Sequence, residues 1–480
     1  MILRFLIKVS FIIASLVVLT TNIYIYTYPS VHPTKCFWHC NELDFLPYRV
    51  KDASKIELAL YYSYRYIKDV TKQMILKRYD EETVNKTNEI RLLAFGDPQI
   101  KGNSESTPYR TRLDTFGNDF YLGHIFDTMV RRLNPTHVAV MGDLFSSQWI
   151  DDSEFYNRTS RYMRRIFKRN TDILFDINNE SHDENGQYQV NTEKWIESKN
   201  LFSYEFENID ESTPIDNEFG YEDLYSWDED SDPTKDSYLF INTTGNHDIG
   251  YSGDITYELL ARYNEMFGKD NYWVEYNKGK DNAWRIVVLN TLLLDGPAYC
   301  PELLDNTWEF LYQVHDRNFS GSTVLITHVP FYKPEGICAD GPQFTYYDDE
   351  MLRSQNHISE ENTNEVFDLI FDNGKSGIIL TGHDHMGCET YYDRKLSDNS
   401  WVPHAGKLLN YNNVIREITV KSMMGQYKGN TGVVTGKFDQ ANRTWSWHYS
   451  TCPFTNEHAW WIAKGSLVVW SIIFSIFILV

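Results

Sequence analysis

The stretch GIILTGHDH, residues 377–385, decides the fold that this sequence predicts. Its first four residues form a short apolar run that begins with Gly, which is typical of a buried β-strand. The run leads into a Thr-Gly turn and then into His383, Asp384 and His385. His383 and His385 lie two positions apart, so at a strand end they point the same way, and imidazole is a common metal ligand. A buried strand that ends in such side chains indicates an α/β fold with a site at the sheet edge.

The same arrangement recurs along the chain. Further apolar runs lie at residues 90–95, 137–141, 238–242, 285–294 and 322–327. Four of them lead into FGDPQ (95–99), MGDLF (141–145), TGNHD (244–248) and ITHVP (326–330). Helical spacing at residues 122–133 and 361–371 supports an alternation of strands and helices. Runs at 414–420, 432–438 and 444–448 read as consecutive antiparallel strands, so we expect two sheets.

The five polar segments supply one set of candidate metal ligands. Taken singly each is weak, because a Gly-Asp pair is often only a turn and a lone histidine is more often a core residue. Their number and order favour convergence at one sheet edge, where rigid strand ends hold side chains in fixed positions. The candidates are Asp97, Gln99, Asp143, Asn246, His328, His383 and His385.

The order of these motifs resembles the calcineurin-like metallophosphoesterase superfamily, whose pattern is D-x-H, G-D, G-N-H-[D/E], H and G-H-x-H. The resemblance covers about residues 90–390 and implies an αββα sandwich of two mixed sheets flanked by helices. It also implies that two divalent metal ions share the ligand set. One metal would be held by Asp97, Gln99 and His385, the other by Asn246, His328 and His383, with Asp143 as the bridge.

Such a metal pair suits phosphate ester hydrolysis. Two divalent cations about 3.5–4 Å apart clamp a phosphoryl group and activate water. His247 would stay off the metals and protonate the leaving oxygen, and Asp248 is a candidate to orient that imidazole. Gln99 departs from the superfamily pattern, which has His there. An amide oxygen makes the first site oxygen-rich and favours Mn²⁺; the alternative is that Gln99 does not ligate and the site holds one metal or none.

Both ends of the chain are apolar. Residues 1–28 carry Arg4 and Lys8 and lack a small-residue cleavage site, so we expect an uncleaved signal anchor, with a cleaved signal peptide as the alternative. Residues 459–480 have Lys464 as their one charge and are long enough to span a bilayer. The alternative there is a buried C-terminal helix. Two spans would place everything between them on one side of the membrane.

The remaining chain divides by composition. Residues 29–89 are expected to form a lead-in with a helix over 56–78, and residues 90–455 the catalytic domain. Residues 171–236 are rich in Asp, Glu, Asn and Ser, so we expect a mobile acidic insertion, either a tolerated loop or a partner-docking segment. The net charge of −22 argues against nucleic acid as a partner.

Sequons and cysteines agree with a lumenal body. Sequons occur at Asn85, Asn157, Asn179, Asn242, Asn318 and Asn442. Six cysteines, with no C-x-x-C pair, suit disulfides in an oxidising compartment, and their spacing leaves the pairing open.

The combination of D-P-Q, T-G-H-D-H and an anchor at each end resembles the fungal branch of the GPI-glycan remodelling phosphoesterases, relatives of the mammalian post-GPI-attachment remodelling enzyme. This resemblance implies removal of ethanolamine phosphate from a GPI mannose in the lumen of the endoplasmic reticulum. It also implies GPI-anchored proteins or GPI glycolipid as substrate and the cargo-export machinery as a partner. Two alternatives stay open: hydrolysis of a nucleotide or another lipid phosphodiester, and a non-catalytic cargo-binding membrane protein. Arg110 and Arg112 are candidates to meet a phosphate or to lie in a solvated loop.

Overall fold

The computed structural model describes most of the chain. The described ranges are residues 2–32, 35–38, 89–103, 106–199, 238–372, 376–395, 400–406 and 414–479, with positions 54, 56–57, 60–61, 63–64, 67–68, 71, 218–219, 224–226 and 374. Cys40, Asn85, most of the helix expected over 56–78 and most of residues 200–236 lie outside them.

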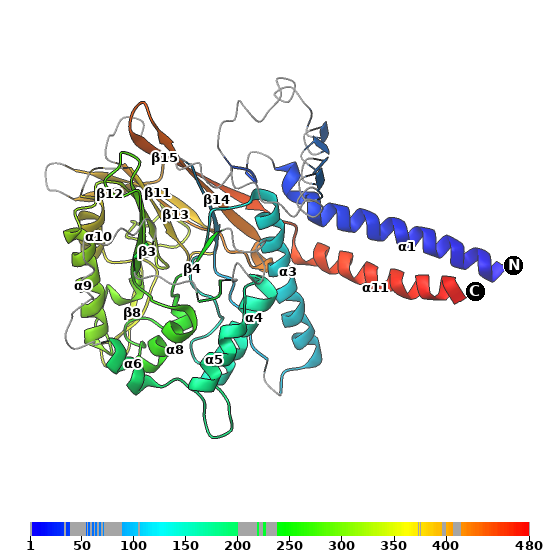
Figure 1. Cartoon of the computed structure of the whole chain (residues 1–480), viewed down its shortest axis with the longest axis horizontal. Helices are drawn as coiled ribbons and strands as arrows, with labels where there is room; N and C mark the ends of the chain where they lie inside the picture. The colour runs from blue at the N-terminus through cyan, green and yellow to red at the C-terminus, as the bar shows by residue number, and fades with distance from the viewer. Residues whose placement is uncertain are drawn as a thin grey trace.

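The domain is built on two mixed β-sheets (Figure 1). The first has the order β15 (Thr444–Pro453), β14 (Asn430–Asp439), β1 (Glu89–Phe95), β2 (His137–Val140) and β4 (Leu239–Asn242). Strands β1, β2 and β4 are parallel, and β14 pairs antiparallel with both β1 and β15. The three parallel strands therefore end at one edge, where FGDPQ, MGDLF and TGNHD begin.

The second sheet has eight strands. Their order is β12 (Trp401–His404), β11 (Cys388–Arg394), β13 (Val414–Thr419), β10 (Gly377–Thr381), β7 (Ser322–Ile326), β6 (Trp284–Val288), β5 (Tyr272–Tyr276) and β3 (Glu218–Phe219). Its centre, from β13 to β6, is parallel. A separate hairpin joins β8 (Phe344–Tyr346) to β9 (Leu352–Gln355).

Two strand predictions need correction. Residues 414–420 do not continue antiparallel into 432–438, because β13 pairs parallel with β10 in the second sheet, where Ile418 joins the core between the sheets. The run 285–294 is not one strand. It ends at Val288 and continues as a short 3-10 helix, η4 (Thr291–Leu293), whose N-terminus is capped by the side chain of Asn290.

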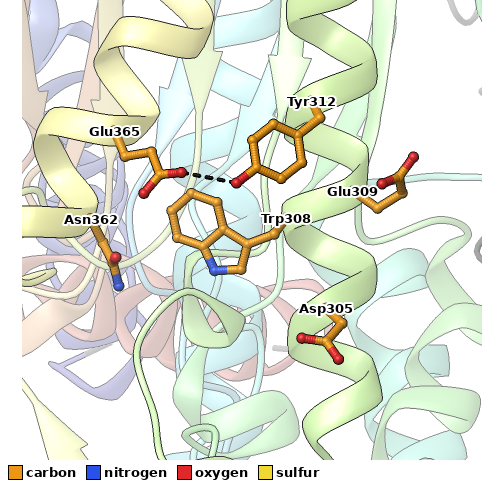
Figure 2. A pocket seen from close by; sticks show the side chains of 6 residues that line it. All are labelled: Asp305, Trp308, Glu309, Tyr312, Asn362 and Glu365. Atoms are coloured by element: carbon orange, nitrogen blue, oxygen red, sulfur yellow. Dashed lines mark hydrogen bonds between the residues drawn. The ribbon is translucent and has the colours of Figure 1, made fainter.

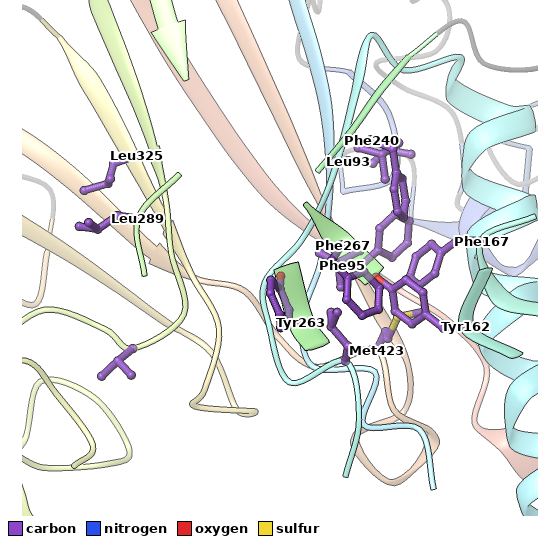
Figure 3. Packing of buried hydrophobic residues seen from close by; sticks show 14 of the residues in the cluster. Leu93, Phe95, Tyr162, Phe167, Phe240, Tyr263, Phe267, Leu289, Leu325 and Met423 are labelled. Carbon is purple, nitrogen blue, oxygen red and sulfur yellow. The ribbon is translucent and has the colours of Figure 1, made fainter. Parts of the chain in front are cut away.

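Alternation along the strands separates two apolar layers. Leu92 and Ala94 face the core between the sheets, whereas Leu93 and Phe95 face outward. Helices cover each outer face: α3 (Tyr109–Leu133) and α4 (Asp152–Arg161) on the first sheet, α9 (Pro301–Asp316) and α10 (Glu360–Phe371) on the second. Figure 3 shows Phe95, Phe167 and Phe240 together on the first sheet and Leu289 and Leu325 on the other. The expected αββα sandwich is confirmed.

The segment expected to be a mobile acidic insertion needs correction in its first part. Residues 171–199 contain α5 (Asp172–Glu180) and α6 (Thr192–Lys199), which pack against α8 (Tyr257–Phe267). The indole of Trp195 contacts Asn264, and Tyr188 donates a hydrogen bond to Glu265. The expectation failed here because a few apolar and aromatic side chains suffice to dock an acidic segment.

Helices α1 (Ile2–Thr27) and α11 (Glu457–Leu479) leave the domain side by side (Figure 1). Both are long and apolar enough to cross a membrane, and only 6% of the most apolar window of α11 is buried, so α11 is not a core helix. Trp470 donates a hydrogen bond to Ser15 across the pair, and Phe11 stacks on Phe477. These two helices indicate membrane association.

Disulfides tie distant parts of the chain. Cys36 pairs with Cys452, which joins the chain after α1 to the end of β15, just before α11. Cys338 pairs with Cys388, and Cys300 is buried and has no disulfide partner among the described cysteines.

The described sequons differ in exposure. Asn157, Asn179, Asn318 and Asn442 are exposed, whereas Asn242 is buried in β4 and accepts a hydrogen bond from Tyr162. Asn242 is therefore unsuited to glycosylation in the folded protein.

Candidate metal centre

The predicted ligands follow the ends of five parallel strands, β1, β2 and β4 of the first sheet and β7 and β10 of the second. Each ligand lies within hydrogen-bonding or ion-pair distance of another member of the set. Loops separated by up to 288 positions, from Asp97 to His385, thus meet at one place.

Two buried carboxylates stand at the centre. Asp97, Asp143 and His328 each offer a ligand atom, and these atoms lie within 4.8 Å of one another. Within the described chain, Oδ2 of Asp97 is buried and has no hydrogen-bond partner. Burial and the neighbouring Asp143 carboxylate raise the pKa of Asp97 well above its usual range. A bound cation would satisfy this oxygen and offset the repulsion between the carboxylates.

The surroundings of His328 also favour a bound cation. Its Nδ1 donates to the Met141 carbonyl oxygen at 2.6 Å, and burial lowers its pKa, so Nε2 presents a lone pair. Nε2 lies 3.0 Å from Oδ1 of Asn246 and 3.3 Å from Oδ1 of Asp143. These three atoms are all hydrogen-bond acceptors, and they lie close together with no proton between them. A divalent cation bound by all three would relieve the repulsion between their lone pairs.

His383 and Asn246 extend this group. Nδ1 of His383 lies 3.0 Å from Oδ1 of Asn246, and the His383 backbone N–H donates to Asp97. Burial lowers the pKa of His383 to about 3, which keeps its imidazole neutral at physiological pH. A neutral imidazole is the form that binds metals.

Gln99 and His385 form the other side of the group. Nε2 of Gln99 donates to Oδ2 of Asp143 at 2.9 Å and lies 3.4 Å from Nε2 of His385. A half-turn of the amide would direct the carbonyl oxygen of Gln99 toward the same groups. Nδ1 of His385 lies 3.0 Å from the hydroxyl of Tyr427, a residue that the sequence did not single out because it lies in η5 (Gly425–Tyr427), outside the five motifs.

The backbone at this centre adopts left-handed conformations. Asp97, Gln99, Asp143 and His383 have φ values of 40°, 41°, 47° and 73°. Residues other than glycine seldom adopt such φ values, and they cluster at functional sites where the surroundings enforce them. A Cβ at Gly245 would lie 2.0 Å from the Asp143 nitrogen, so the TGNHD and MGDLF loops can approach this closely only with glycine there.

The expected role of Asp248 needs correction. Its buried carboxylate accepts backbone N–H bonds from Leu144 (3.1 Å), Phe145 (3.0 Å) and Gly245 (2.9 Å). Its oxygens therefore join two ligand loops and do not orient the His247 imidazole, since they are committed to the main chain.

His247 lies beside the ligands but is open to solvent. Its backbone N–H donates to Asp143, Nε2 lies 3.9 Å from Oδ2 of Asp143, and the side chain is 38% exposed. A substrate can reach this imidazole without displacing a ligand. Arg110 and Arg112 lie in the exposed first turn of α3.

A second hollow lies away from this centre. A groove with a volume of about 580 Å³ lies between α9 and α10. Figure 2 shows the residues that line it: Asp305, Trp308, Glu309, Tyr312, Asn362 and Glu365. Its carboxylates would repel a phosphate, and it contains none of the predicted ligands.

Sequence comparisons relate this chain to known proteins. No family model matches the chain. Protein TED1 of Saccharomyces cerevisiae is 50% identical over 469 residues, which cover 95% of each chain. Metallophosphoesterase 1 of Danio rerio is 23% identical over 223 residues, 41% of this chain and 50% of the zebrafish protein. A 5'-nucleotidase precursor from Thermus thermophilus aligns over 80% of this chain and 58% of its own, with 10% identity and a TM-score of 0.29, too low to support an argument.

Proposed function

The chain belongs to the family of Protein TED1 of Saccharomyces cerevisiae and is metallophosphoesterase-like, and we propose that it is a two-metal phosphodiesterase that removes ethanolamine phosphate from a mannose of GPI glycans. We place it in the endoplasmic reticulum membrane with its domain in the lumen, where this step supports export of GPI-anchored proteins.

One observation carries the catalytic part of the proposal. At a single sheet edge, the oxygens of Asp97 and Asp143 converge with Nε2 of His328, and one buried carboxylate oxygen has no partner among the described residues. Buried acceptor atoms that lie this close together repel one another, so the arrangement is unfavourable without a cation. It becomes favourable when the same atoms bind divalent cations. Asp97, Gln99 and His385 would hold one ion and Asn246, His328 and His383 the other, with Asp143 shared. We favour Mn²⁺, because carboxylate and amide oxygens outnumber nitrogen on the first side.

The chain's own residues then have separate tasks. The cations, when bound, would neutralise the phosphate and activate water. The solvent-open imidazole of His247 is placed to protonate the departing sugar oxygen. Asp248 keeps the loops of Asp143 and Asn246 together, and the Met141 carbonyl fixes the His328 ring.

The membrane helices support a substrate held in a bilayer. A GPI glycan is confined to one leaflet, and an enzyme anchored at both ends searches the same thin layer at high effective concentration. A soluble nucleotide would gain nothing from this arrangement.

Purified full-length protein loaded with Mn²⁺ would test the catalytic part. We expect two equivalents of metal per chain and hydrolysis of bis(p-nitrophenyl) phosphate that Asp143→Asn abolishes. Metal below one equivalent, or equal hydrolysis by the variant, would overturn the two-metal reading and favour a non-catalytic protein. Faster turnover of a nucleotide than of a GPI glycolipid would favour the soluble-substrate alternative.

A further inference from the structure

The first two turns of α3 project from the domain with apolar side chains in solvent. Tyr109, Leu113 and Phe116 are 81%, 44% and 48% exposed. Their spacing of four and three positions puts them on one face of the helix. The second half of α3 exposes no large apolar side chain, so this exposed set, the α3 stripe, is confined to the end that leaves the domain.

The α3 stripe lies next to the membrane helices. At Gly117, one residue beyond Phe116, a Cβ would lie only 1.7 Å from the indole of Trp461, so α3 and α11 touch there. Figure 1 shows α3 running across the base of α1 and α11. The contact therefore lies where the terminal helices enter the domain.

The side chains at this level are of the kinds that are common at a membrane interface. The ammonium of Lys464 lies 5.2 Å from the ring of Tyr26 and 5.9 Å from that of Trp460. Aromatic rings and a long basic side chain are enriched where a spanning helix passes the lipid headgroups. Because Trp461 follows Trp460, the crossing at Gly117 lies level with these side chains.

Basic side chains lie beside the α3 stripe in a chain whose net charge is −22, and Asp114 is the one acidic residue among residues 109–116. Arg110 and Arg112 are exposed on the same turns. The turn η3 (Tyr162–Ile166) packs on α3, and residues 162–168 contain Arg164, Arg165 and Lys168 and no acidic residue; Arg165 also pairs with Asp119 of α3. Within them, the Arg165 guanidinium lies 5.5 Å from the Phe116 ring, and Arg164 and Lys168 are exposed. Apolar side chains flanked by basic ones are the pattern of a helix that lies in an interface with anionic lipid.

We propose that the α3 stripe inserts into the headgroup layer of the bilayer that holds α1 and α11. Tyr109 comes ten positions after Gln99, and α3 runs back from the sheet edge where the ligands lie. Insertion therefore holds the candidate metal centre close to the lipid surface. This last consequence rests on the proposed function, whereas the membrane contact does not.

Photo-crosslinking tests the contact directly. Full-length protein with p-benzoylphenylalanine in place of Phe116 is placed in nanodiscs of phosphatidylcholine and phosphatidylserine. The matched control carries it in place of Phe175, which is 68% exposed on α5. We expect lipid adducts at position 116 and none at 175. No adduct at 116, or equal adducts at both positions, would overturn the proposal.

Activity measurements test whether insertion of the α3 stripe holds the candidate metal centre close to a lipid substrate. Leu113→Glu with Phe116→Glu should lower kcat/KM on a GPI glycolipid in nanodiscs about tenfold and leave hydrolysis of the soluble chromogenic diester unchanged. Phe175→Glu should change neither. Equal loss on both substrates would mean a structural defect and contradict the consequence. If wild type cleaves the diester but not the glycolipid, the proposed substrate is wrong, and the crosslinks still decide the membrane contact.

Discussion

The hydroxyl of Tyr427 lies 3.0 Å from Nδ1 of His385, whose Nε2 faces Gln99 at 3.4 Å. The tyrosine thereby fixes the ring through the nitrogen that is turned away from the centre. Such outer partners set the orientation and the tautomer of metal-binding histidines.

Tyr427→Phe should weaken binding of one metal by about 10–100-fold, the usual cost of losing such a partner. Titration of Mn²⁺ into metal-free protein would measure it. The control is Tyr312→Phe, which removes a remote hydroxyl bonded to Glu365. Equal affinities for the two variants would show that Tyr427 does not position a ligand.

Asp248→Ala should destabilise the domain strongly. It leaves three buried backbone N–H groups of two ligand loops without an acceptor, at about 1–3 kcal/mol each. We expect a Tm lower by many degrees and loss of metal. A variant with wild-type Tm and metal content would contradict the assigned role.

His247→Ala should behave differently, because this side chain is half-exposed and holds no loop in place. Metal content and Tm should stay near wild type, while turnover of an alkyl phosphodiester falls about 10²–10⁴-fold, the scale of a lost general acid. The loss should shrink for a p-nitrophenyl leaving group, which needs no proton. Near-normal turnover of the alkyl diester would refute the role.

The buried His137 predicts a pH dependence of stability outside the metal centre. Burial lowers its pKa from 6.5 to about 3, so the folded protein keeps it neutral where the unfolded chain protonates it. Stability is therefore lost as pH falls below about 6.5, by up to about 1.4 kcal/mol per pH unit for this group. The difference in Tm between His137→Gln and wild type should shift in favour of the variant from pH 6.5 to pH 4. A difference in Tm that does not change with pH would show that His137 does not contribute to the pH dependence of stability.

Short-range signals made much of this molecule predictable. The strands before FGDPQ, MGDLF and TGHDH were expected because apolar runs and glycine turns act locally, and most of the seven ligands came from those turns. The ends of the chain were equally clear, because a spanning helix must be apolar on every face.

Long-range contacts account for what the sequence did not predict. Tyr427 reaches His385 across 42 positions, and Asp248 reaches Phe145 across 103. Which sheet β13 joins depends on its pairing with β10, which is also non-local. Helices α5 and α6 are stabilised by packing on α8, so their acidic composition alone does not predict that they are ordered.

The central claim is tested most directly by the GPI glycans of cells that carry only the Asp143→Asn form of this protein. Mass spectrometry of released anchors should show one additional ethanolamine phosphate on a mannose compared with wild type, because the proposed bridge between the metals is lost. Anchors identical to wild type, in cells without a redundant enzyme, would contradict the account.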